Sequence, residues 1–598
     1  MAKELPKRSE VDEKYTWNLT DLYPSMEAWE KDLNRYGEMG RMVMRYEGKV
    51  GADAENLYFV LTTFTQMEEM MAKVFHYVQR LYDQDTADTK NQSYCGKAFN
   101  LYASVGSEIA FIDPEIIAIS EEQLEQFYKE KEELEFFRRY VNEIRRRKEH
   151  CLSAELEKVM ALTAEMAQVP SDTYSVLGNA DMHFPAIQDE EGETVRITHG
   201  RFISLLESPN RQLRKEVFEK YYGEYKQYLN TFASLYNGQV KKQIFYAKMR
   251  KYPSNLSAAV DENNVPVTVY RNLIDTVNAN LDKMHAYVTL RKKLLKVDTL
   301  NMYDIYTPMI SGVAKKYSYS QAQDMILKAL QPLGEEYVAK VKEGFENRWI
   351  DVYENQGKRS GAYSAAVYGV HPYVLMKYNE SLDSVFTLIH EMGHSMHSYY
   401  SDTTQPYIYS QYKIFVAEVA STCNEVLLLE YLLRQTEDKK ERAYLLNHYL
   451  DMFKGTLFRQ TQFAEFELQS NEIAERGENL NADNLSSLYL ELNQKYYGQD
   501  MVSNPEIAYE WARIPHFYYN FYVYQYATSF AAAVAIAHNI LEQGAPMVEK
   551  YIGFLKSGCS APPVEQLRAV GIDLEKPKPI QSALDVMAHV ISELDSLA

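Results

Sequence analysis

The stretch Thr387–Ser401, TLIHEMGHSMHSYYS, places three histidines and one glutamate within the eight residues 390–397. Residues 390–394 match the motif H-E-x-x-H. If the stretch is helical, His390 and His394 lie one turn apart and can direct imidazole nitrogens at one Zn²⁺. Glu391 then lies beside them, where it can take a proton from an attacking water. The alternative is a chance match on an ordinary buried helix.

The residues around the motif favour a helix. Val385, Ile389, Met392 and Met396 recur three or four residues apart, which gives a buried face distinct from the face that carries the histidines. Ser381 or Asp383, just before this pattern, can cap the start of the helix. The spacing therefore predicts the geometry that a metal centre requires.

A catalytic zinc keeps three protein ligands and one open position, so a third ligand is needed. His397 is one candidate, but the metzincin pattern needs glycine at 397 and histidine at 400, where this chain has His397 and Tyr400. We therefore interpret His397 as a packing residue or as support for the ligands.

The segment Lys413–Leu433 offers a better third ligand. Glu418 and Glu425 lie seven residues apart, two turns along one face of an otherwise apolar helix. Two carboxylates on such a helix are costly to bury without a cation. We predict Glu418 as the third ligand and Glu425 as a residue that orients one histidine from behind. A half-exposed helix with two solvated glutamates remains open as the alternative.

Composition and charge restrict the class of protein. The 598 residues are 46% hydrophobic and 25% charged, as in a folded globular chain, with a net charge of −20. Acidic residues spread along the chain repel phosphate backbones, which argues against nucleic acid and anionic membranes as partners. No signal sequence begins the chain, and its most apolar run is too short to span a bilayer. The four dispersed cysteines fit a reducing compartment, so we expect a cytoplasmic protein.

The pattern along the chain is mainly helical. Two exceptions stand out: FPAIQDEEGETVRIT at 184–198 predicts a β-hairpin, and 357–378 predicts one or two short strands just before the motif. We expect an N-terminal helical domain over residues 1–200 and a second domain over 201–598. Two helix starts are predicted from capping signals, at Ser208 with Pro209 and at Ser320 with Gln323.

Six blocks extend the argument beyond the motif. They are YTWNLTDLYPS at 15–25, DENNVPVTVYRNLI at 261–274, GKRSGAYS at 357–364, the block 378–401 that contains H-E-x-x-H, FVAEVASTCNE at 415–425, and WARIPHFYYNFYVYQYATSFAAA at 511–533. In this order they resemble the oligoendopeptidase F family, relatives of thimet oligopeptidase, over almost the whole chain.

The resemblance implies a zinc endopeptidase of mainly α fold. Two helical lobes would flank a deep channel with one Zn²⁺ per chain at its floor and a small β element near the active site. Such a channel admits short unstructured oligopeptides and excludes folded proteins. Carried onto this chain, the resemblance makes His390, His394 and Glu418 the ligands and Glu391 the general base.

The resemblance also points to residues that bind substrate. A histidine and tyrosines in the block 511–533 would donate hydrogen bonds to the substrate carbonyl and the oxyanion. We favour His516, Tyr519 and Tyr524 for this role, with Tyr522 as a further substrate-binding residue, although any of these tyrosines could instead be core packing. In GKRSGAYS, Gly361 and Ala362 would let a peptide approach as an added β-strand, and a tight turn is the competing explanation for Gly361.

The sequence thus predicts metal-assisted hydrolysis of internal peptide bonds. One alternative is a helical zinc peptidase that trims from an end, such as a dipeptidyl carboxypeptidase or a carboxypeptidase. Another, from a different class, is a non-catalytic peptide-binding protein, but that hypothesis predicts a damaged motif and here the motif is intact.

Overall fold

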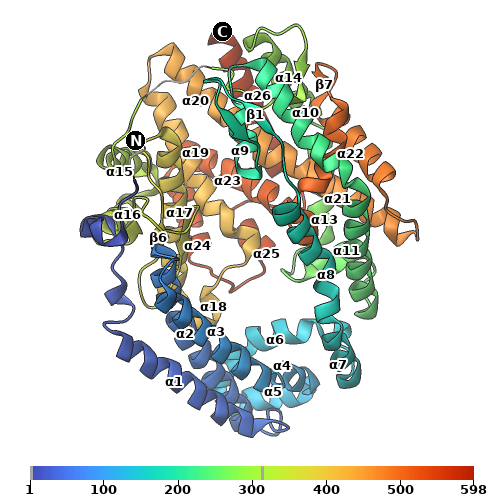
Figure 1. Ribbon diagram of the computed structural model, residues 1–598. Helices are drawn as coiled ribbons and strands as arrows, with labels where there is room; N and C mark the ends of the chain where they lie inside the picture. The colour runs from blue at the N-terminus through green and yellow to red at the C-terminus, as the bar shows by residue number, and fades with distance from the viewer. Residues whose placement is uncertain (1–3, 311–314, 598) are drawn as a thin grey trace. The chain divides into compact units, whose positions relative to one another are not determined.

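The computed structural model describes residues 4–310 and 315–597, and most of its regular structure is α-helical (Figure 1). Its short strands form three small sheets, one of two antiparallel strands, one of two parallel strands, and one of three strands in the order β4-β6-β5. The predicted mainly α fold with a small β element is confirmed.

The chain divides into two compact units, each assembled from three segments of sequence. Unit 1 comprises residues 1–149, 315–428 and 536–570, and unit 2 comprises residues 150–314, 429–535 and 571–598. Two of the boundaries fall inside long helices, α19 and α23. Neither unit is continuous in sequence, so they do not coincide with the expected domains 1–200 and 201–598, and that division stays a prediction.

The elements of unit 1 begin with six helices and continue with the three-stranded sheet and the helices around it. They are α1 Met26–Val43, α2 Ala54–Gln84, α3 Thr89–Glu108, α4 Ile112–Ala118, α5 Glu121–Glu130, α6 Arg138–Arg146, α15 Tyr319–Ala329, α16 Glu335–Glu346, β4 Ile350–Asp351, β5 Tyr363–Ala365, β6 Tyr373–Leu375, α17 Leu382–Thr404, α18 Tyr407–Ser410, the first part of α19 Ala417–Gln435, the end of α23 Tyr524–Gln543, α24 Ala545–Leu555 and α25 Pro563–Ala569.

Unit 2 holds the remaining elements. They are α7 Ala154–Leu162, α8 Ala164–Val176, β1 Ala186–Gln188, β2 Thr194–Arg196, α9 His199–Leu206, α10 Arg211–Gln227, α11 Leu229–Met249, α12 Asn255–Asp261, α13 Val267–Asn278, α14 Leu281–Leu294, β3 Leu300–Asn301, the end of α19, α20 Lys439–Met452, α21 Arg459–Glu475, α22 Ala482–Tyr497, β7 Met501–Val502, the 3₁₀ segments Pro505–Arg513 and Pro515–Tyr518, the start of α23, and α26 Lys578–Leu597.

The strand predictions are confirmed, and the two predicted helix starts are wrong. The hairpin pairs Ile187 with Val195, and the stretch 357–378, where one or two strands were expected, contains two, β5 and β6. The helix after Ser208 begins at Arg211 with Asn210 as its cap, and the later helix is capped by Ser318, two residues before Ser320. In both cases a second polar residue close by accepts the free N–H groups of the first turn.

The sheet of unit 1 packs on the N-terminal helices. Tyr373 and Leu375 of β6 belong to the same buried cluster as Trp29 and Tyr36 of α1, and all four side chains are fully buried. β6 is the central strand, parallel to β4 and antiparallel to β5, so β5 lies at an edge of this sheet. The chain then passes from β6 into α17, which contacts both β5 and β6.

A buried carboxylate ties β5 to α2. Asp83, which is fully buried near the end of α2, accepts a hydrogen bond from Tyr363 Oη at 2.6 Å and one from Arg359 at 3.1 Å. Arg80, one helical turn earlier, lies 3.7 Å from the same carboxylate. The backbone N–H of Arg359 also donates to Asp83 O at 2.9 Å. Charges buried in this way stabilise a fold only when each has a partner, as here.

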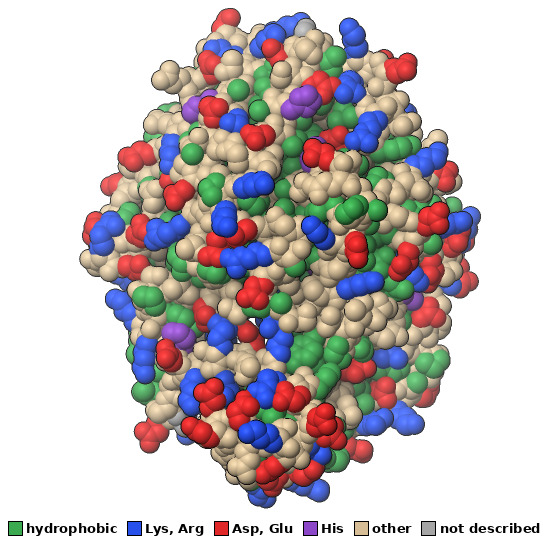
Figure 2. Space-filling view, turned by 180° about the vertical axis from the view of Figure 1, so that it is seen from behind, with side chains coloured by type: hydrophobic (Ala, Val, Ile, Leu, Met, Phe, Trp, Pro, Cys, Tyr) green, Lys and Arg blue, Asp and Glu red, His purple; other side chains and the backbone are tan. Residues whose placement is uncertain are grey.

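Three further observations bear on the expected setting of the protein. Among the described helices, none is both long enough and apolar enough to cross a membrane. All four cysteines are unpaired. On the face shown in Figure 2, acidic and basic side chains are interspersed and no single charge dominates.

We expect the Asp83→Ala variant to lower the free energy of unfolding by about 3–5 kcal/mol, because it leaves the buried Arg80 without its carboxylate. Urea unfolding of the full chain measures the change. The Glu30→Ala variant is the control, since its ion pair with Lys97 is about half exposed and should contribute less than about 1 kcal/mol. Equal effects of the two variants would contradict this account of the anchor.

Candidate metal centre

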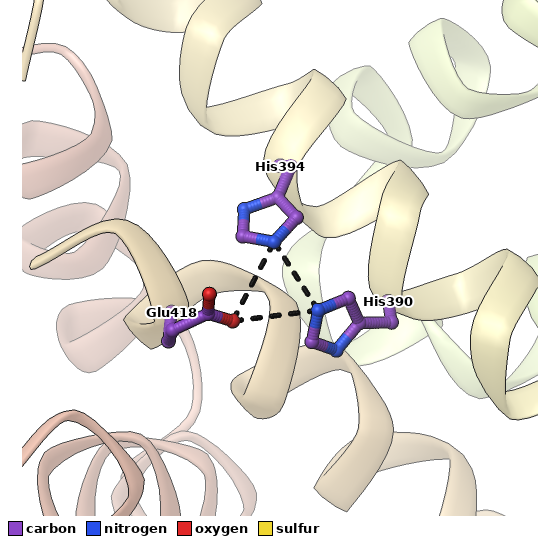
Figure 3. A group of neighbouring side chains, drawn as sticks. All are labelled: His390, His394 and Glu418. Atoms are coloured by element: carbon purple, nitrogen blue, oxygen red, sulfur yellow. Dashed lines mark hydrogen bonds and ion pairs between the residues drawn. The ribbon is translucent and has the colours of Figure 1, made fainter. Parts of the chain in front are cut away.

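Two histidines of α17 and one glutamate of α19 bring three donor atoms together (Figure 3). The Nε2 atoms of His390 and His394 lie 3.2 Å apart, and Glu418 Oε2 lies 3.4 Å from the first and 3.5 Å from the second. All three donor atoms lie within 4.8 Å of one another. Two imidazoles and one carboxylate are a donor set found in catalytic zinc sites.

The local sequence of α17 explains how the histidines are presented. Ser381 caps the helix by accepting the N–H of Ser384, as one of the two predicted caps. Ile389 and Met392 are fully buried, while the side chains of His390 and His394 remain 25% and 17% exposed. The apolar face is thus directed into unit 1, and the histidine face stays accessible to an ion and to water.

The placement of Glu418 depends on a close approach of two helices at Gly393. A Cβ atom at Gly393 would lie 2.5 Å from Ser421 Cα and 2.7 Å from the carbonyl oxygen of Ala420, distances that no side chain tolerates. Only glycine therefore lets the backbone of α19 pass this close to α17. Ser421 then donates a hydrogen bond from Oγ to Glu418 Oε2 at 3.1 Å, which orients the carboxylate.

A buried asparagine fixes the same pair of helices one turn away. Asn424 of α19 is fully buried, and its Nδ2 donates to the backbone carbonyl of Ile389 on α17 at 3.4 Å. Its Oδ1 accepts from Tyr337 Oη of α16 at 3.1 Å. Since Asn424 precedes Glu425 and Ile389 precedes His390, this contact sets the register of the donors.

Glu425 lies beside His390, and its predicted role in orienting that histidine stays a prediction. Its Oε2 is 3.4 Å from His390 Nδ1, so the ring lies between this carboxylate and that of Glu418. Burial lowers the pKa of His390, but the attraction of Glu425 and Glu418 outweighs it and holds the pKa well above its usual range. Burial acts in the opposite direction on Glu418 and raises the pKa of its carboxyl, but the hydrogen bonds with the two histidines outweigh burial and hold this pKa well below its usual range.

Glu391 is buried beside the donors and is not one of them. It is 6% exposed, and its Oε2 has no hydrogen-bond partner among the described residues. Burial raises the pKa of this carboxyl, with the two histidines opposing the shift. An unpartnered carboxylate oxygen next to a cluster of metal-type donors is a suitable proton acceptor.

His397 packs and does not join the donors. Its ring stacks on Tyr412 with centroids 3.7 Å apart and an interplanar angle of 2°, and it also contacts Phe554. The side chain is 1% exposed, and burial lowers its pKa to about 3. The imidazole of His397 is therefore neutral and packs with the aromatic rings of Tyr412 and Phe554 on the buried side of α17.

The block GKRSGAYS leads into the edge strand β5. Gly361 has φ of +88°, and a Cβ there would meet no atom within 4 Å, so its backbone conformation, not crowding, requires glycine. This favours the tight-turn explanation for Gly361. Ala362 directly precedes β5. Within the strand, Ser364 Oγ lies 2.8 Å from Ser395 Oγ of α17. The substrate-binding role of Gly361 and Ala362 stays a prediction.

The predicted substrate-binding histidine and tyrosines belong to unit 2. The ring of His516 lies 5.7 Å from that of Tyr519, 6.1 Å from that of Tyr522 and 6.0 Å from that of Tyr526. Tyr519 is 57% exposed, and burial lowers the pKa of His516. These four rings form one aromatic cluster at the start of α23.

Tyr524 lies apart from this cluster. It is 2% exposed, and its ring packs on Tyr270 with centroids 4.9 Å apart. Of the two tyrosines chosen for the oxyanion, Tyr519 is therefore in the cluster and Tyr524 is in the core. The role of Tyr524 toward substrate stays a prediction.

Sequence reasoning missed two residues of the candidate metal centre, Gly393 and Asn424, which set the helix pair. Gly393 carried a usable signal, because a glycine in mid-helix is unfavourable unless a neighbour approaches closely. Asn424 carried none, because its contacts with α16 and α17 depend on tertiary packing.

The donor set, with a buried glutamate beside it on a mainly helical fold, is typical of a metallopeptidase. Residues 204–586 match the family described as Peptidase family M3, and residues 115–184 match the family described as Oligopeptidase F. The chain belongs to peptidase family M3. The predicted membership of the oligoendopeptidase F group and the predicted metallopeptidase class are confirmed.

Similar proteins cover the chain from end to end. Oligopeptidase PepF of Bacillus subtilis is 47% identical over 596 residues, which are 100% of this chain and 89% of that protein. The plasmid-encoded oligoendopeptidase F of Lactococcus lactis subsp. cremoris is 42% identical, over 100% of this chain and 99% of that protein.

Solved structures agree with the fold. A putative peptidase from Chlamydophila abortus superposes with a TM-score of 0.92 at 36% identity, covering 100% of both chains. The oligoendopeptidase-F from Enterococcus faecium superposes with a TM-score of 0.76 at 37% identity, covering 96% of this chain and 99% of that one.

We expect the Gly393→Ala variant to bind metal more weakly, because the added methyl group pushes α19 and Glu418 away from the histidines. Metal content after dialysis against a series of buffered Zn²⁺ concentrations measures the change, and a loss of roughly 10–100-fold in affinity is expected. The Gly96→Ala variant in α3 is the control, because a Cβ there meets nothing within 4 Å. Unchanged metal affinity in the Gly393→Ala variant would contradict the role of the close approach.

Proposed function

We propose that this chain is a zinc-dependent endopeptidase that hydrolyses internal bonds of short, unstructured oligopeptides. The observation that carries the proposal is the convergence of His390, His394 and Glu418 within 4.8 Å, with Glu391 buried beside them. The names of the relatives, oligopeptidase and oligoendopeptidase, support the choice of peptide substrates.

The residues present fit a zinc ion. Two imidazole nitrogens and one carboxylate oxygen supply three ligands and leave a fourth position open, and Glu425 is placed to fix the orientation of His390. Bound there, zinc would lower the pKa of the attacking water and polarise the scissile carbonyl. The three ligands come from unit 1 alone.

Glu391 is proposed to move the proton. Its buried, unpartnered Oε2 can accept a proton from the attacking water as the water oxygen bonds to the scissile carbon, and its raised pKa lets the carboxyl hold that proton. The same carboxyl can then donate the proton to the nitrogen as the C–N bond breaks, so that a neutral amine leaves and the residue is unchanged at the end of the reaction.

Substrate contacts are proposed for two segments. Because β5 is an edge strand, the segment that begins with Gly361 and Ala362 can accept a peptide as a further strand. From the family resemblance, His516 and Tyr519 are proposed to donate hydrogen bonds to the substrate carbonyl and the oxyanion, with Tyr522 at their side. Each such donor contributes about 3 kcal/mol to transition-state stabilisation in known peptidases.

The proposed setting is the cytoplasm, with free oligopeptides as partners. The four unpaired cysteines support a reducing compartment. Enzymes that trim from one end remain the competing class, and they differ from an endopeptidase in needing a free terminus on the substrate.

The deciding experiment uses an internally quenched peptide blocked at both ends. Cleavage is measured with the protein as purified, after chelation, and after Zn²⁺ is added back. Internal cleavage that is lost with the chelator and restored by Zn²⁺ supports the proposal. Cleavage only of peptides with a free end would favour an end-trimming peptidase, and bound zinc with no cleavage of any peptide would favour a binding protein.

We expect the Glu391→Gln variant to keep its zinc and to lose turnover by roughly 10²–10⁴-fold, because glutamine preserves the shape of the side chain and cannot accept the proton. Metal content and kcat on the blocked peptide are measured together. A variant that retains both zinc and turnover would exclude Glu391 as the general base.

A further inference from the structure

The segment that follows His516 has an unusual backbone. Asn520 and Phe521 both adopt left-handed conformations, with φ of 52° and 55°. Asparagine tolerates this region, but a bulky aromatic residue rarely adopts it. Two such residues in succession persist only where the surroundings enforce them, and strain of this kind gathers at functional sites.

Three buried side chains hold the segment, one from each of three helices. Gln239 of α11 donates from Nε2 to the carbonyl of Tyr518 at 2.9 Å. Asn255 of α12 donates from Nδ2 to Asn520 Oδ1 at 2.9 Å. Glu467 of α21 accepts the backbone N–H of Phe521 at 2.6 Å.

Each of the three holding side chains leaves one polar atom unused. Gln239 Oε1, Asn255 Oδ1 and Glu467 Oε2 are buried without a hydrogen-bond partner among the described residues, and the three side chains are at most 2% exposed. A buried polar atom without a protein partner is costly, and three such atoms lie around this one turn.

Among residues 518–521 of the turn, Tyr519 is the only one whose side chain is exposed. Tyr519 is 57% exposed and contacts the rings of His516 and Tyr522, whereas Tyr518 and Phe521 on either side are buried. A backbone change at Asn520 or Phe521 would therefore redirect Tyr519 first.

We propose that Glu467 is a positioning residue: by holding the Phe521 N–H it fixes the left-handed turn and so directs Tyr519 toward the peptide substrate. The inference rests on the proposed function in assigning Tyr519 to substrate. Glu467 is chosen over Gln239 and Asn255 because it holds the backbone of the more strained residue and uses its only partnered oxygen to do so.

The first test compares two variants of Glu467. Glu467→Gln keeps an acceptor oxygen for Phe521, and Glu467→Met keeps the size of the side chain and removes the acceptor. We expect Glu467→Met to lower kcat on the blocked peptide by roughly tenfold to a hundredfold with KM within about twofold, because misplacement by about 1 Å has effects of this size. Glu467→Gln should retain most of kcat, and zinc content should not change in either variant.

Two controls separate positioning from loss of stability. The Glu465→Met variant removes another buried carboxylate of α21. This carboxylate binds Lys495 and Tyr496 and does not contact the turn, so the variant should lower stability and leave kcat unchanged. Hydrogen exchange in peptides that cover 517–523 should rise in Glu467→Met and not in Glu465→Met. Unchanged exchange in Glu467→Met would overturn the role of Glu467.

The second test is a double-mutant cycle with Tyr519→Phe. If Glu467 acts through the Tyr519 hydroxyl, Glu467→Met should have little further effect on kcat in the Tyr519→Phe background. Full additivity would show that Glu467 acts elsewhere and would overturn the inference. Full activity of Tyr519→Phe alone would contradict the proposed substrate role of Tyr519, and the inference would fail with it, although cleavage that depends on zinc would still stand.

The pH dependence of stability gives an independent measurement. Burial raises the pKa of Glu467 to about 8, opposed by the Phe521 N–H, and the titratable groups that face it are Tyr236 of α11 and Tyr270 of α13, which burial keeps neutral. Between 4.5, the ordinary pKa of a glutamate, and about 8, the folded chain retains a proton that the unfolded chain releases, so stability is lost progressively over this range and no further above it. We expect the melting temperature of the wild type to fall between about pH 5 and 8 relative to that of Glu467→Gln. Curves that run parallel throughout this range would contradict the buried, unpaired state of Glu467.

Discussion

The contact between α17 and α19 at Gly393 determines the geometry of the candidate metal centre. With the backbone of Ser421 where a side chain at 393 would otherwise lie, the two helices can bring Glu418 within 3.4 to 3.5 Å of both histidines. Asn424 repeats the constraint one turn further by bonding to the carbonyl of Ile389. The three candidate donors are therefore brought together by the packing of two helix backbones.

The constraint extends from the helix pair to the N-terminal part of the chain. β5 contacts α17 and is also tied through Tyr363 and Arg359 to the buried Asp83 of α2. Segments more than 250 residues apart in sequence thus hold one edge strand beside the helix that carries the donors. This arrangement joins the beginning and the middle of the chain within unit 1.

Periodic and local features could be predicted from the sequence, and contacts between distant elements could not. The H-E-x-x-H helix, its Ser381 cap and the hairpin depend on spacing of a few residues, and the structure contains each of them. Helix starts at Ser208 and Ser320 were wrong because several polar residues near each start can act as the cap. Tyr519 and Tyr524 differ by five positions in a run of tyrosines, and only tertiary packing places one in the aromatic cluster and the other in the core.

Two buried glutamates of unit 2 have opposite electrostatic surroundings. Glu510 is 2% exposed, and Arg459 and Arg513 hold its pKa well below its usual range despite burial. Glu467 is 1% exposed and has no such cation, so burial raises its pKa to about 8. A fold selected for stability alone would pair or remove the second carboxylate, as it pairs the first. The unpaired carboxyl group of Glu467 next to the strained turn is therefore best explained by the position of Tyr519, which the turn directs. In the same way, the unpartnered oxygen of Glu391 is explained by the candidate metal donors beside it.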